Sequence, residues 1–397
     1  MNKKVYLDYN ATTPLHPEVK KTIIENLDSF GNASSMHSYG REVREKLEKA
    51  RSDIATFINA ESEELIFVGS GSEANNTVIN TVTCQLKNCK SGGACSSGGL
   101  IISSIEHPCI IESANCAEQR GRKVFRLPVN RDGIIDLEKL ENILKTNRIS
   151  LVSVMTVNNE TGAIQDIKKI TELAHKYNAL MHTDAIQAVG KMDIDVKELG
   201  LDFLSFSAHK IYGPKGIGAL YIKKNTPFCP LIYGGHQEMG RRAGTENSLG
   251  IIAFHTAVLM RKKEMKEEHD RILKLREQLR KSISDNISDV FFNGSPDKTM
   301  YNCINVSFAG AEGEAILLYL DLEGIAVSTG SACSSQSLEP SHVLLASGLD
   351  LELAHGSLRI SLGRETTQED IEYVSEKLPG IIEKIRKMST TYKRDKG

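Results

Sequence analysis

The sequence predicts an α/β protein built on a mainly parallel sheet, and three observations lead to this fold class. Short apolar runs alternate with helical stretches between residues 65 and 222. Strands that alternate with helices in this way favour βαβ units, whose strands lie parallel. The composition is 40% hydrophobic and 25% charged, which is typical of a globular protein. The 397 residues are also enough to bury a large core without disulfides or metal ions.

The individual elements follow from the spacing of the apolar residues. Helix is expected over most of 15–60, where Val43, Leu47, Ile54 and Phe57 form one stripe. The central strands are predicted over 65–68, 100–104, 123–129, 150–157, 179–184, 203–207 and 218–222. The helices between them are predicted over 73–87, 110–120, 137–145 and 167–177.

The character of the chain changes after residue 250. A long charged helical pattern covers 253–285 and is expected to cross from a large domain to a second, smaller one. Short strands are then predicted over 290–293, 304–308, 325–328 and 357–362. A last helix is predicted from Thr366, because Thr366 and Glu369 have the spacing of a capping box.

Charge and hydropathy exclude several classes of function. The chain has 49 Lys and Arg and 51 Asp and Glu, so we expect neither direct nucleic-acid binding nor an anionic-membrane role. No segment approaches the roughly 20 apolar residues that span a bilayer. The start, MNKKVYLDYNATTP, lacks the apolar core of a signal peptide. We therefore expect a cytoplasmic protein whose eight cysteines are free thiols.

Two charged residues end predicted strands. Asp184 closes a buried apolar strand, where a carboxylate is costly unless it meets a cation or a donor. Lys210 follows another strand, and a lysine in mostly apolar surroundings can act as a Schiff-base amine. Taken singly, a helix cap and a solvated lysine are the better explanations. Taken together, they are the carboxylate and amine that a pyridoxal phosphate (PLP) site needs.

Three further features are consistent with such a site. The segment GSGSEANN at 69–76 follows a strand and opens a helix, so Gly71 and Ser72 can hold a phosphate, although an ordinary capped loop is the alternative. His107 follows the strand at 100–104 and can lie against a flat ring and move protons, although a lone histidine is usually structural. Arg359 in an apolar strand needs an anion, either a substrate carboxylate or a structural partner.

Among the cysteines, Cys333 is the candidate nucleophile. It lies among Gly, Ser and Thr, which indicates an exposed loop rather than a core, and the alternative is a chance surface thiol. Cys303, by contrast, lies among apolar residues and is expected to be buried and inert.

The remaining cysteines predict no metal site. Cys84, Cys89 and Cys95 have the spacing C-x4-C-x5-C, which matches no common zinc or iron–sulfur pattern. We interpret them as loop thiols, with metal binding as the alternative. Cys109 and Cys116 are seven residues apart and are expected to share the inward face of one helix.

Several long motifs in order resemble the cysteine desulfurases of the NifS and IscS kind, within the class-V aminotransferase family of PLP enzymes. The motifs are YLDYNATTP (6–14), GSGSEANN (69–76), EHP (106–108), VNNETG (157–162), HTDAIQAVGK (182–191), SFSAHKIYGPKGIGALY (205–221), GGHQEMGRRAGTEN (234–247), STGSACSSQSLEPSHV (328–343) and AHGSLRISLGR (354–364). The match runs over nearly the whole length of the chain.

This resemblance implies PLP fold type I, of the aspartate aminotransferase kind. It implies a large PLP-binding domain over 15–255, with a mainly parallel sheet flanked by helices. A smaller α/β domain over 256–397 would carry the loop of Cys333. An N-terminal segment, 1–14, would pack with the small domain.

The resemblance also implies roles for residues at matching positions. Lys210 would form the internal aldimine with PLP and act as the base, His107 would stack on the ring and carry protons, and Cys333 would be the nucleophile. The other cofactor contacts would be Asp184 to the ring nitrogen, Gln187 to the ring hydroxyl, Asn159 on the cofactor or substrate side, Gly71, Ser72, Ser207 and His209 to the phosphate, and Thr245 to the phosphate of the neighbouring subunit. Arg359, helped by Asn32, would bind the substrate carboxylate.

The activity implied is the conversion of L-cysteine to L-alanine with a persulfide on Cys333, in a homodimer. A scaffold of the NifU or IscU type would accept the sulfur for iron–sulfur cluster assembly. Selenocysteine lysis and sulfur donation for tRNA thiolation remain alternatives on the same PLP scaffold. A non-catalytic sulfur or metal carrier is a rival from another class. The sequence also leaves open whether Cys333 transiently ligates a shared cluster.

Overall fold

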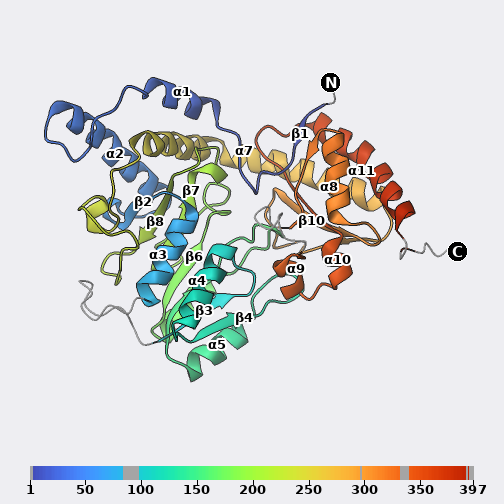
Figure 1. Ribbon diagram of the computed structural model, residues 1–397, viewed down its shortest axis with the longest axis horizontal. Coiled ribbons are helices and arrows are strands. Elements are labelled where there is room, and N and C mark those ends of the chain that lie inside the picture. Colours follow the sequence, from blue (N-terminus) through green and yellow to red (C-terminus); the bar gives the residue numbers. More distant parts are fainter. Residues whose placement is uncertain (1–2, 84–97, 296, 331–338, 390–391, 393–397) are drawn as a thin grey trace.

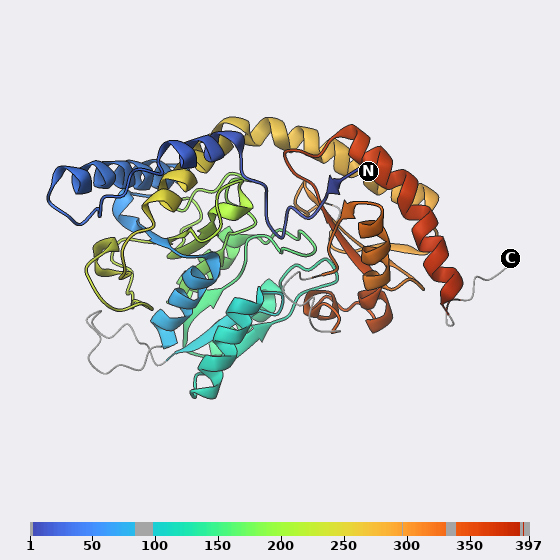
Figure 2. The same ribbon diagram turned by 45° about the horizontal axis from the view of Figure 1, so that its top comes forward.

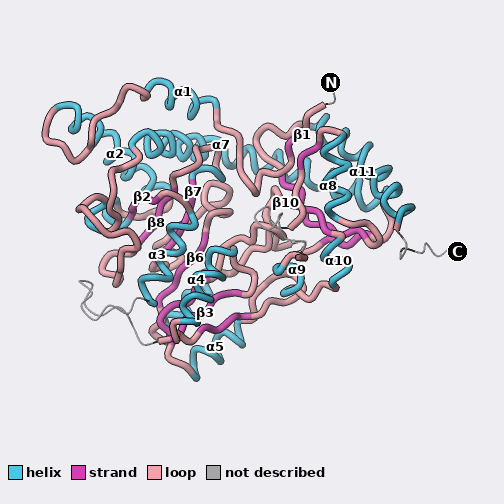
Figure 3. Tube along the Cα trace, in the orientation of Figure 1, coloured by secondary structure: helices cyan, strands magenta, loops and turns pink. Residues whose placement is uncertain are grey.

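We describe a computed structural model, which gives the structure of residues 3–83, 98–295, 297–330, 339–389 and 392. Strands gather in two regions of the molecule, a large sheet and a smaller group near both termini (Figure 3). The helices lie around these sheets, with α7 running along one side of the molecule (Figure 1).

The large sheet has seven strands in the order β2-β8-β7-β6-β5-β3-β4. Its strands are β2 (Leu65–Val68), β3 (Gly99–Ser103), β4 (Val124–Leu127), β5 (Ile149–Ser153), β6 (Leu180–Asp184), β7 (Phe203–Ser207) and β8 (Gly218–Ile222). Neighbours from β4 to β7 pair parallel, and β8 runs antiparallel to both of its neighbours. The α/β class with a mainly parallel sheet is therefore confirmed. Because the carboxyl ends of β3, β5, β6 and β7 share one edge, side chains that follow them converge there.

Helices cover both faces of this sheet. The helices of the large-sheet region are α1 (Pro17–Glu25), α2 (Ser38–Phe57), α3 (Gly71–Thr83), α4 (Pro108–Gln119), α5 (Leu137–Thr146) and α6 (Ile167–Lys176). Apolar residues of α3 and α4 pack on one face, against Ile66, Ile102 and Phe203 among others. The larger core on the other face includes Val43, Leu47 and Ile54, three members of the predicted stripe of α2. Burial on both faces explains why these strands are uninterrupted apolar runs.

The second group of strands is smaller. A three-stranded antiparallel sheet has the order β12-β10-β9, built from β9 (Val290–Phe292), β10 (Cys303–Phe308) and β12 (Ser357–Ser361). The N-terminal strand β1 (Val5–Tyr6) pairs parallel with β11 (Ile325–Ala326). The shorter helices of this region are α8 (Gly313–Leu322), α9 (His342–Ala346) and α10 (Leu351–His355).

One long helix joins the two regions. Helix α7 (Ser248–Asn286) packs on α1 and α2 and also on the last helix, α11 (Gln368–Met388). It extends from the large sheet to the smaller one in Figure 2. The helix is continuous through residue 255, where the sequence placed a domain boundary, and the proposed division into domains stays a prediction.

The structure corrects three details of the predicted elements. Helix α3 begins at Gly71 rather than 73, because the Ser70 hydroxyl accepts the Glu73 N–H and caps it. The capping box of α11 is Thr367 with Asp370, one residue later than predicted. Strand β5 ends at Ser153, four residues early, and the following segment forms a loop closed by a bridge between Val157 and Ile164.

Candidate active site

A cavity of about 240 Å³ lies at the carboxyl edge of the large sheet. Ten residues singled out in the sequence line it: Gly71, Ser72, His107, Asn159, Asp184, Gln187, Ser207, His209, Lys210 and Arg359. They come from positions as far apart as 71 and 359, so their convergence is a property of the fold. The cavity is also lined by residues that the sequence analysis did not single out: Asn10, Ala11, Ser70, Met155 and Ile186.

Lys210 ends the short helix η2 (Ala208–Lys210), which follows β7. Its Nζ donates to the backbone oxygens of Asn10, at 2.6 Å, and Ala11, at 2.7 Å. The lysine is half-buried and lines the cavity, so it is not a solvated loop lysine. Both of these acceptors are uncharged carbonyl groups, and an amine that lines a cavity is within reach of a ligand bound there.

Asp184 is the last residue of β6 and is buried in the wall of the cavity. Its carboxylate accepts the Asn75 Nδ2–H at 2.7 Å and the Ile186 N–H at 3.0 Å. Burial raises the pKa of Asp184, while the Ile186 N–H, His107, Asn75 and Lys210 act in the opposite direction. A cation in the cavity would also oppose the effect of burial and favour the ionised carboxylate.

His107 is the N-cap of α4, directly after the turn that leaves β3. Its Nδ1 accepts the backbone N–H of Cys109 at 3.2 Å, so the proton of the neutral ring lies on Nε2. Burial lowers the pKa of His107, although Asp184 opposes this effect. The ring is therefore a neutral imidazole whose Nε2–H remains as a hydrogen-bond donor.

The N-terminus of α3 also lines the cavity. Gly71 and Ser72 are its first residues, and the first-turn N–H groups of a helix favour a phosphate. A Cβ at Gly71 would lie 2.2 Å from Cδ1 of Ile186, so glycine keeps this approach open. Ser207 and His209 line the same cavity, and burial lowers the pKa of His209 to about 4.

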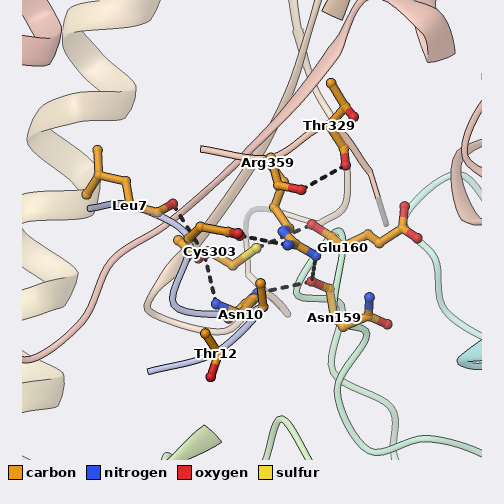
Figure 4. Close-up of polar contacts among 12 residues, drawn as sticks. Leu7, Asn10, Thr12, Asn159, Glu160, Cys303, Thr329 and Arg359 are labelled. Atoms are coloured by element: carbon orange, nitrogen blue, oxygen red, sulfur yellow. Dashed lines mark hydrogen bonds and ion pairs between the residues drawn. The ribbon is translucent and has the colours of Figure 1, made fainter. Parts of the chain in front are cut away.

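Arg359 reaches the cavity from β12, in the smaller sheet. Its Nη2 donates to the Asp8 carboxylate at 2.8 Å. Its Nη1 donates to the Asn159 carbonyl at 3.2 Å (Figure 4). Its Nε, buried, has no hydrogen-bond partner within the described part of the chain. The structural ion pair considered from the sequence therefore exists with Asp8, and the guanidinium still has unused donor capacity.

Two predicted residues lie elsewhere in this chain. Asn32 and Thr245 are both exposed and do not line the cavity, so their roles stay predictions. Cys333 lies outside the described residues, as do Cys84, Cys89 and Cys95. The nucleophilic role of Cys333 and the interpretation of the other three as loop thiols therefore also stay predictions.

The cysteines that the structure describes differ in their exposure to solvent. Cys303 is buried, as expected, and burial raises its pKa to about 11. The prediction that Cys116 shares the inward face of its helix with Cys109 is wrong, because Cys116 is exposed. In the described ranges, no group of three or more His, Cys, Asp or Glu side chains is placed to hold a metal ion. Over the same ranges, no helix combines the length and the apolar character required to cross a membrane.

Asn10 is the main residue that sequence reasoning missed. Its backbone oxygen accepts from Lys210, and its Nδ2 donates to the Asn159 carbonyl at 3.1 Å. It lies on the N-terminal segment, far in sequence from both partners. The only available signal was its place in the YLDYNATTP motif.

Glu106 gives a prediction that is independent of any ligand. The carboxyl is fully buried, accepts from the Ser103 hydroxyl and the Met155 N–H, and has a pKa raised by burial to about 8. The native state therefore binds a proton that the unfolded state releases near pH 4.5. The free energy of unfolding of the apoprotein should fall as pH rises from about 4.5 to 8, by roughly 1.4 kcal/mol per pH unit at most.

The variant Glu106→Gln, which mimics the protonated carboxyl, should remove most of this loss. Urea unfolding at about pH 5, 6, 7 and 8 measures it across the window between the two pKa values. Glu118→Gln, which changes an exposed glutamate on α4, is the control and should leave the slope unchanged. Equal slopes for Glu106→Gln and the wild type would show that Glu106 is ionised throughout.

Comparisons with known proteins identify the family of the chain. The model of the family "Aminotransferase class-V" matches residues 5–374. A protein named cysteine desulfurase IscS from Dictyoglomus turgidum is 47% identical over 396 residues, covering 100% of this chain and 98% of the relative. A protein named cysteine desulfurase from Mus musculus is 41% identical, covering 98% and 83%. The solved structure of a NifS-like protein from Rickettsia africae superposes with a TM-score of 0.87 at 35% identity, covering 96% and 100%.

The fold and site thus define a PLP-dependent enzyme of fold type I. The chain belongs to the class-V aminotransferase family, as the motifs predicted. The residues present also fit PLP on their own chemistry. One cavity holds a lysine amine, a buried carboxylate and a glycine-lined helix N-terminus, which suit an aldehyde, a ring nitrogen and a phosphate respectively.

Proposed function

We propose that this chain is a PLP-dependent cysteine desulfurase that converts L-cysteine to L-alanine and passes the sulfur to its own Cys333. The observation that carries this proposal is the single cavity that brings together Lys210, Asp184, His107 and Arg359. An aminotransferase on the same fold needs the first three of these residues. The Cys333 segment and the names of the relatives favour sulfur transfer.

In this proposal each side chain has a defined task. Lys210 holds the cofactor aldehyde in the resting enzyme and, once displaced by the substrate amine, removes the Cα proton. Asp184 binds the ring nitrogen and keeps its proton in place, supported by Asn75. Bound PLP supplies the electron sink that lowers the barrier to removal of the Cα proton. Gly71, Ser72, Ser207 and His209 hold the phosphate, and Asn159 contacts the cofactor or the substrate. All five residues line the cavity.

Proton transfer to and from sulfur is assigned to His107. Because its Nδ1 accepts the Cys109 N–H, the neutral ring carries its proton on Nε2 and offers sulfur an N–H donor there. Its lowered pKa keeps the ring neutral. To accept the thiol proton of the substrate or Cys333 at Nε2, the ring first moves its own proton to Nδ1 and gives up the hydrogen bond from the Cys109 N–H. The Cys333 thiolate then attacks the substrate sulfur. The carbon–sulfur bond of the substrate breaks, a sulfur–sulfur bond forms, and protonation of the substrate carbon gives L-alanine.

Several finer points belong to the same proposal. The partition into 1–14, 15–255 and 256–397 assigns the cofactor to the large unit and Cys333 to the small one. We also propose a homodimer, in which Thr245 reaches the phosphate site of the partner and Asn32 assists at the substrate site. The sulfur acceptor would be an iron–sulfur scaffold of the NifU or IscU type, in the cytoplasm.

The test is release of L-alanine and sulfide from L-cysteine by the PLP-loaded protein with dithiothreitol. The wild type should release both products in equal amounts. Cys333→Ala should lower their release about 10²-fold or more while the visible absorbance of bound PLP remains, because the nucleophile is lost but the cofactor site is intact. Cys116→Ala, which removes an exposed thiol, is the matched control and should match the wild type.

The outcomes separate the alternatives. A wild type that releases no alanine would refute the desulfurase assignment. Full turnover by Cys333→Ala would exclude Cys333 as the sulfur acceptor. If that variant also processed selenocysteine faster than cysteine, the selenocysteine lyase alternative would replace the proposal.

A further inference from the structure

A buried lysine that the mechanism above does not use lies directly behind the cavity. Lys191 is only 7% exposed. Its Nζ donates to Oε1 of Gln187 at 2.7 Å and to Oδ1 of Asn10 at 3.3 Å. Both acceptors are neutral amide oxygens, so they offset only part of the free-energy cost of removing the ammonium from water. Such a placement needs a reason beyond packing.

The first consequence concerns Gln187. The oxygen and nitrogen of a glutamine amide are assigned from their hydrogen bonds, and an ammonium group only donates. Lys191 therefore fixes Oε1 toward itself and turns Nε2 the other way. Nε2 donates to the Asn10 carbonyl at 2.9 Å, and Gln187 lines the cavity. The side of this amide that a cofactor meets is thus an N–H donor.

The second consequence concerns Asn10. Its Oδ1 accepts from Lys191 and from Asn302 Nδ2, at 3.3 Å each. Its Nδ2 is thereby directed to the Asn159 carbonyl, which also accepts from Arg359. Figure 4 shows Asn10 beside Asn159 and below Arg359. The backbone oxygen of the same Asn10 accepts from Lys210, so one buried cation orders contacts on the cofactor side and on the substrate side.

The protonation of Lys191 depends on the charged groups around it. Burial lowers the pKa of Lys191 to about 7. Lys210 in η2 and Arg261 in α7 lower it further, whereas Cys303 in β10 and Glu268 in α7 act in the opposite direction. A ligand that consumes the charge of Lys210 would favour the charged form of Lys191.

We propose that Lys191 is a positioning residue of the cofactor site. Its Nζ orients the side-chain amides of Gln187 and Asn10. Gln187 then presents an N–H donor to the oxygen on the cofactor ring, and Asn10 keeps its hydrogen bonds with Lys210 and Asn159. The proposal rests on the proposed function, since it concerns PLP bound in this cavity.

The experiment is a double-mutant cycle on Lys191→Met and Gln187→Met. Two quantities are measured: the PLP dissociation constant, and the pH midpoint at which the visible absorbance of lysine-bound PLP changes. Lys191→Met should weaken PLP binding about tenfold, as expected for loss of one well-oriented hydrogen bond to a charged group, and should raise the midpoint by about half a pH unit or more. The midpoint rises because the deprotonated form loses a donor and a nearby positive charge.

The double variant shows whether Lys191 affects PLP binding through Gln187. If it acts through Gln187, the double variant should bind PLP less than about twofold more weakly than Gln187→Met alone. Additive losses would overturn the proposal. Leu378→Ala, which removes a buried side chain of α11, is the control for instability and should lower the melting temperature without moving the midpoint.

Failure of this inference can be told from failure of the proposed function. A wild type that binds no PLP and shows no visible band would remove the function itself. A wild type that loads normally, with a Lys191→Met variant of equal affinity and midpoint, would overturn only the positioning role.

A second variant keeps the test decisive should Lys191→Met fail to fold. Lys191→Gln then replaces it in the same cycle. This variant loses the charge but keeps an N–H donor, so it should lie between the wild type and Gln187→Met in both measurements. A wild-type result in both would overturn the proposal if Gln187→Met itself is impaired.

Discussion

Replacing Lys210 by alanine should lower turnover of L-cysteine by about 10⁴-fold or more, because this residue is assigned two tasks at once. Its amine holds the cofactor aldehyde and later removes the Cα proton. Both tasks need a nucleophilic nitrogen at one point of the cavity, where Nζ now lies between the carbonyls of Asn10 and Ala11. The measurement is alanine release together with the visible spectrum. The spectrum of Lys210→Ala should show PLP without its covalent lysine link.

A second variant tests whether Lys210 acts as a nucleophile or only through its positive charge. Lys210→Arg keeps a positive group near Asp184 but offers no usable nucleophile, since arginine does not deprotonate in proteins. It should therefore be as inactive as Lys210→Ala. Lys223→Ala, which changes an exposed lysine just after β8, should retain wild-type turnover. If Lys210→Arg kept more than about a tenth of the activity, the lysine would act through its charge alone and the proposed base would have to be another group.

The positions of the site residues were predictable to the extent that they follow strands. His107 and Lys210 each follow a strand of the parallel sheet and Asp184 ends one, so the fold class already placed them at one edge. What local sequence could not give is contact across the chain. Asp8 and Arg359 are 351 residues apart, and Asn10 meets Lys210 from 200 residues away. Such pairs depend on how the N-terminal segment runs between the two sheets.

Protonation states were also beyond the sequence. Glu106 and Asp184 both follow or end apolar strands, and nothing in their neighbours distinguishes them. The structure distinguishes them. The Asp184 carboxylate accepts hydrogen bonds from Asn75 and Ile186, and the nearby basic groups of His107 and Lys210 oppose the effect of burial on its pKa. Glu106, by contrast, has one carboxyl oxygen without a partner in the described residues. Burial is a property of the folded chain, so such differences emerge only when every neighbour is known.

Arg359 tests how the substrate carboxylate is bound. Changing it to alanine should reduce kcat/KM for L-cysteine by about 10³-fold, since a bidentate pair of charge-assisted hydrogen bonds would be lost. The effect should fall mainly on KM, and PLP should still bind. The variant also leaves the Asp8 carboxylate without its 2.8 Å partner, so a lower melting temperature should accompany it.

The substitution Arg359→Lys separates the loss of substrate binding from the loss of stability. It keeps a positive charge for Asp8 and should restore much of the stability. A lysine ammonium, however, cannot bind a carboxylate through two parallel N–H groups as a guanidinium does. Its kcat/KM should therefore remain about 10²-fold below the wild type. Arg364→Lys, three residues beyond β12 and outside the cavity lining, is the control and should behave as the wild type. Full recovery of kcat/KM in Arg359→Lys would mean that Arg359 serves only its ion pair with Asp8.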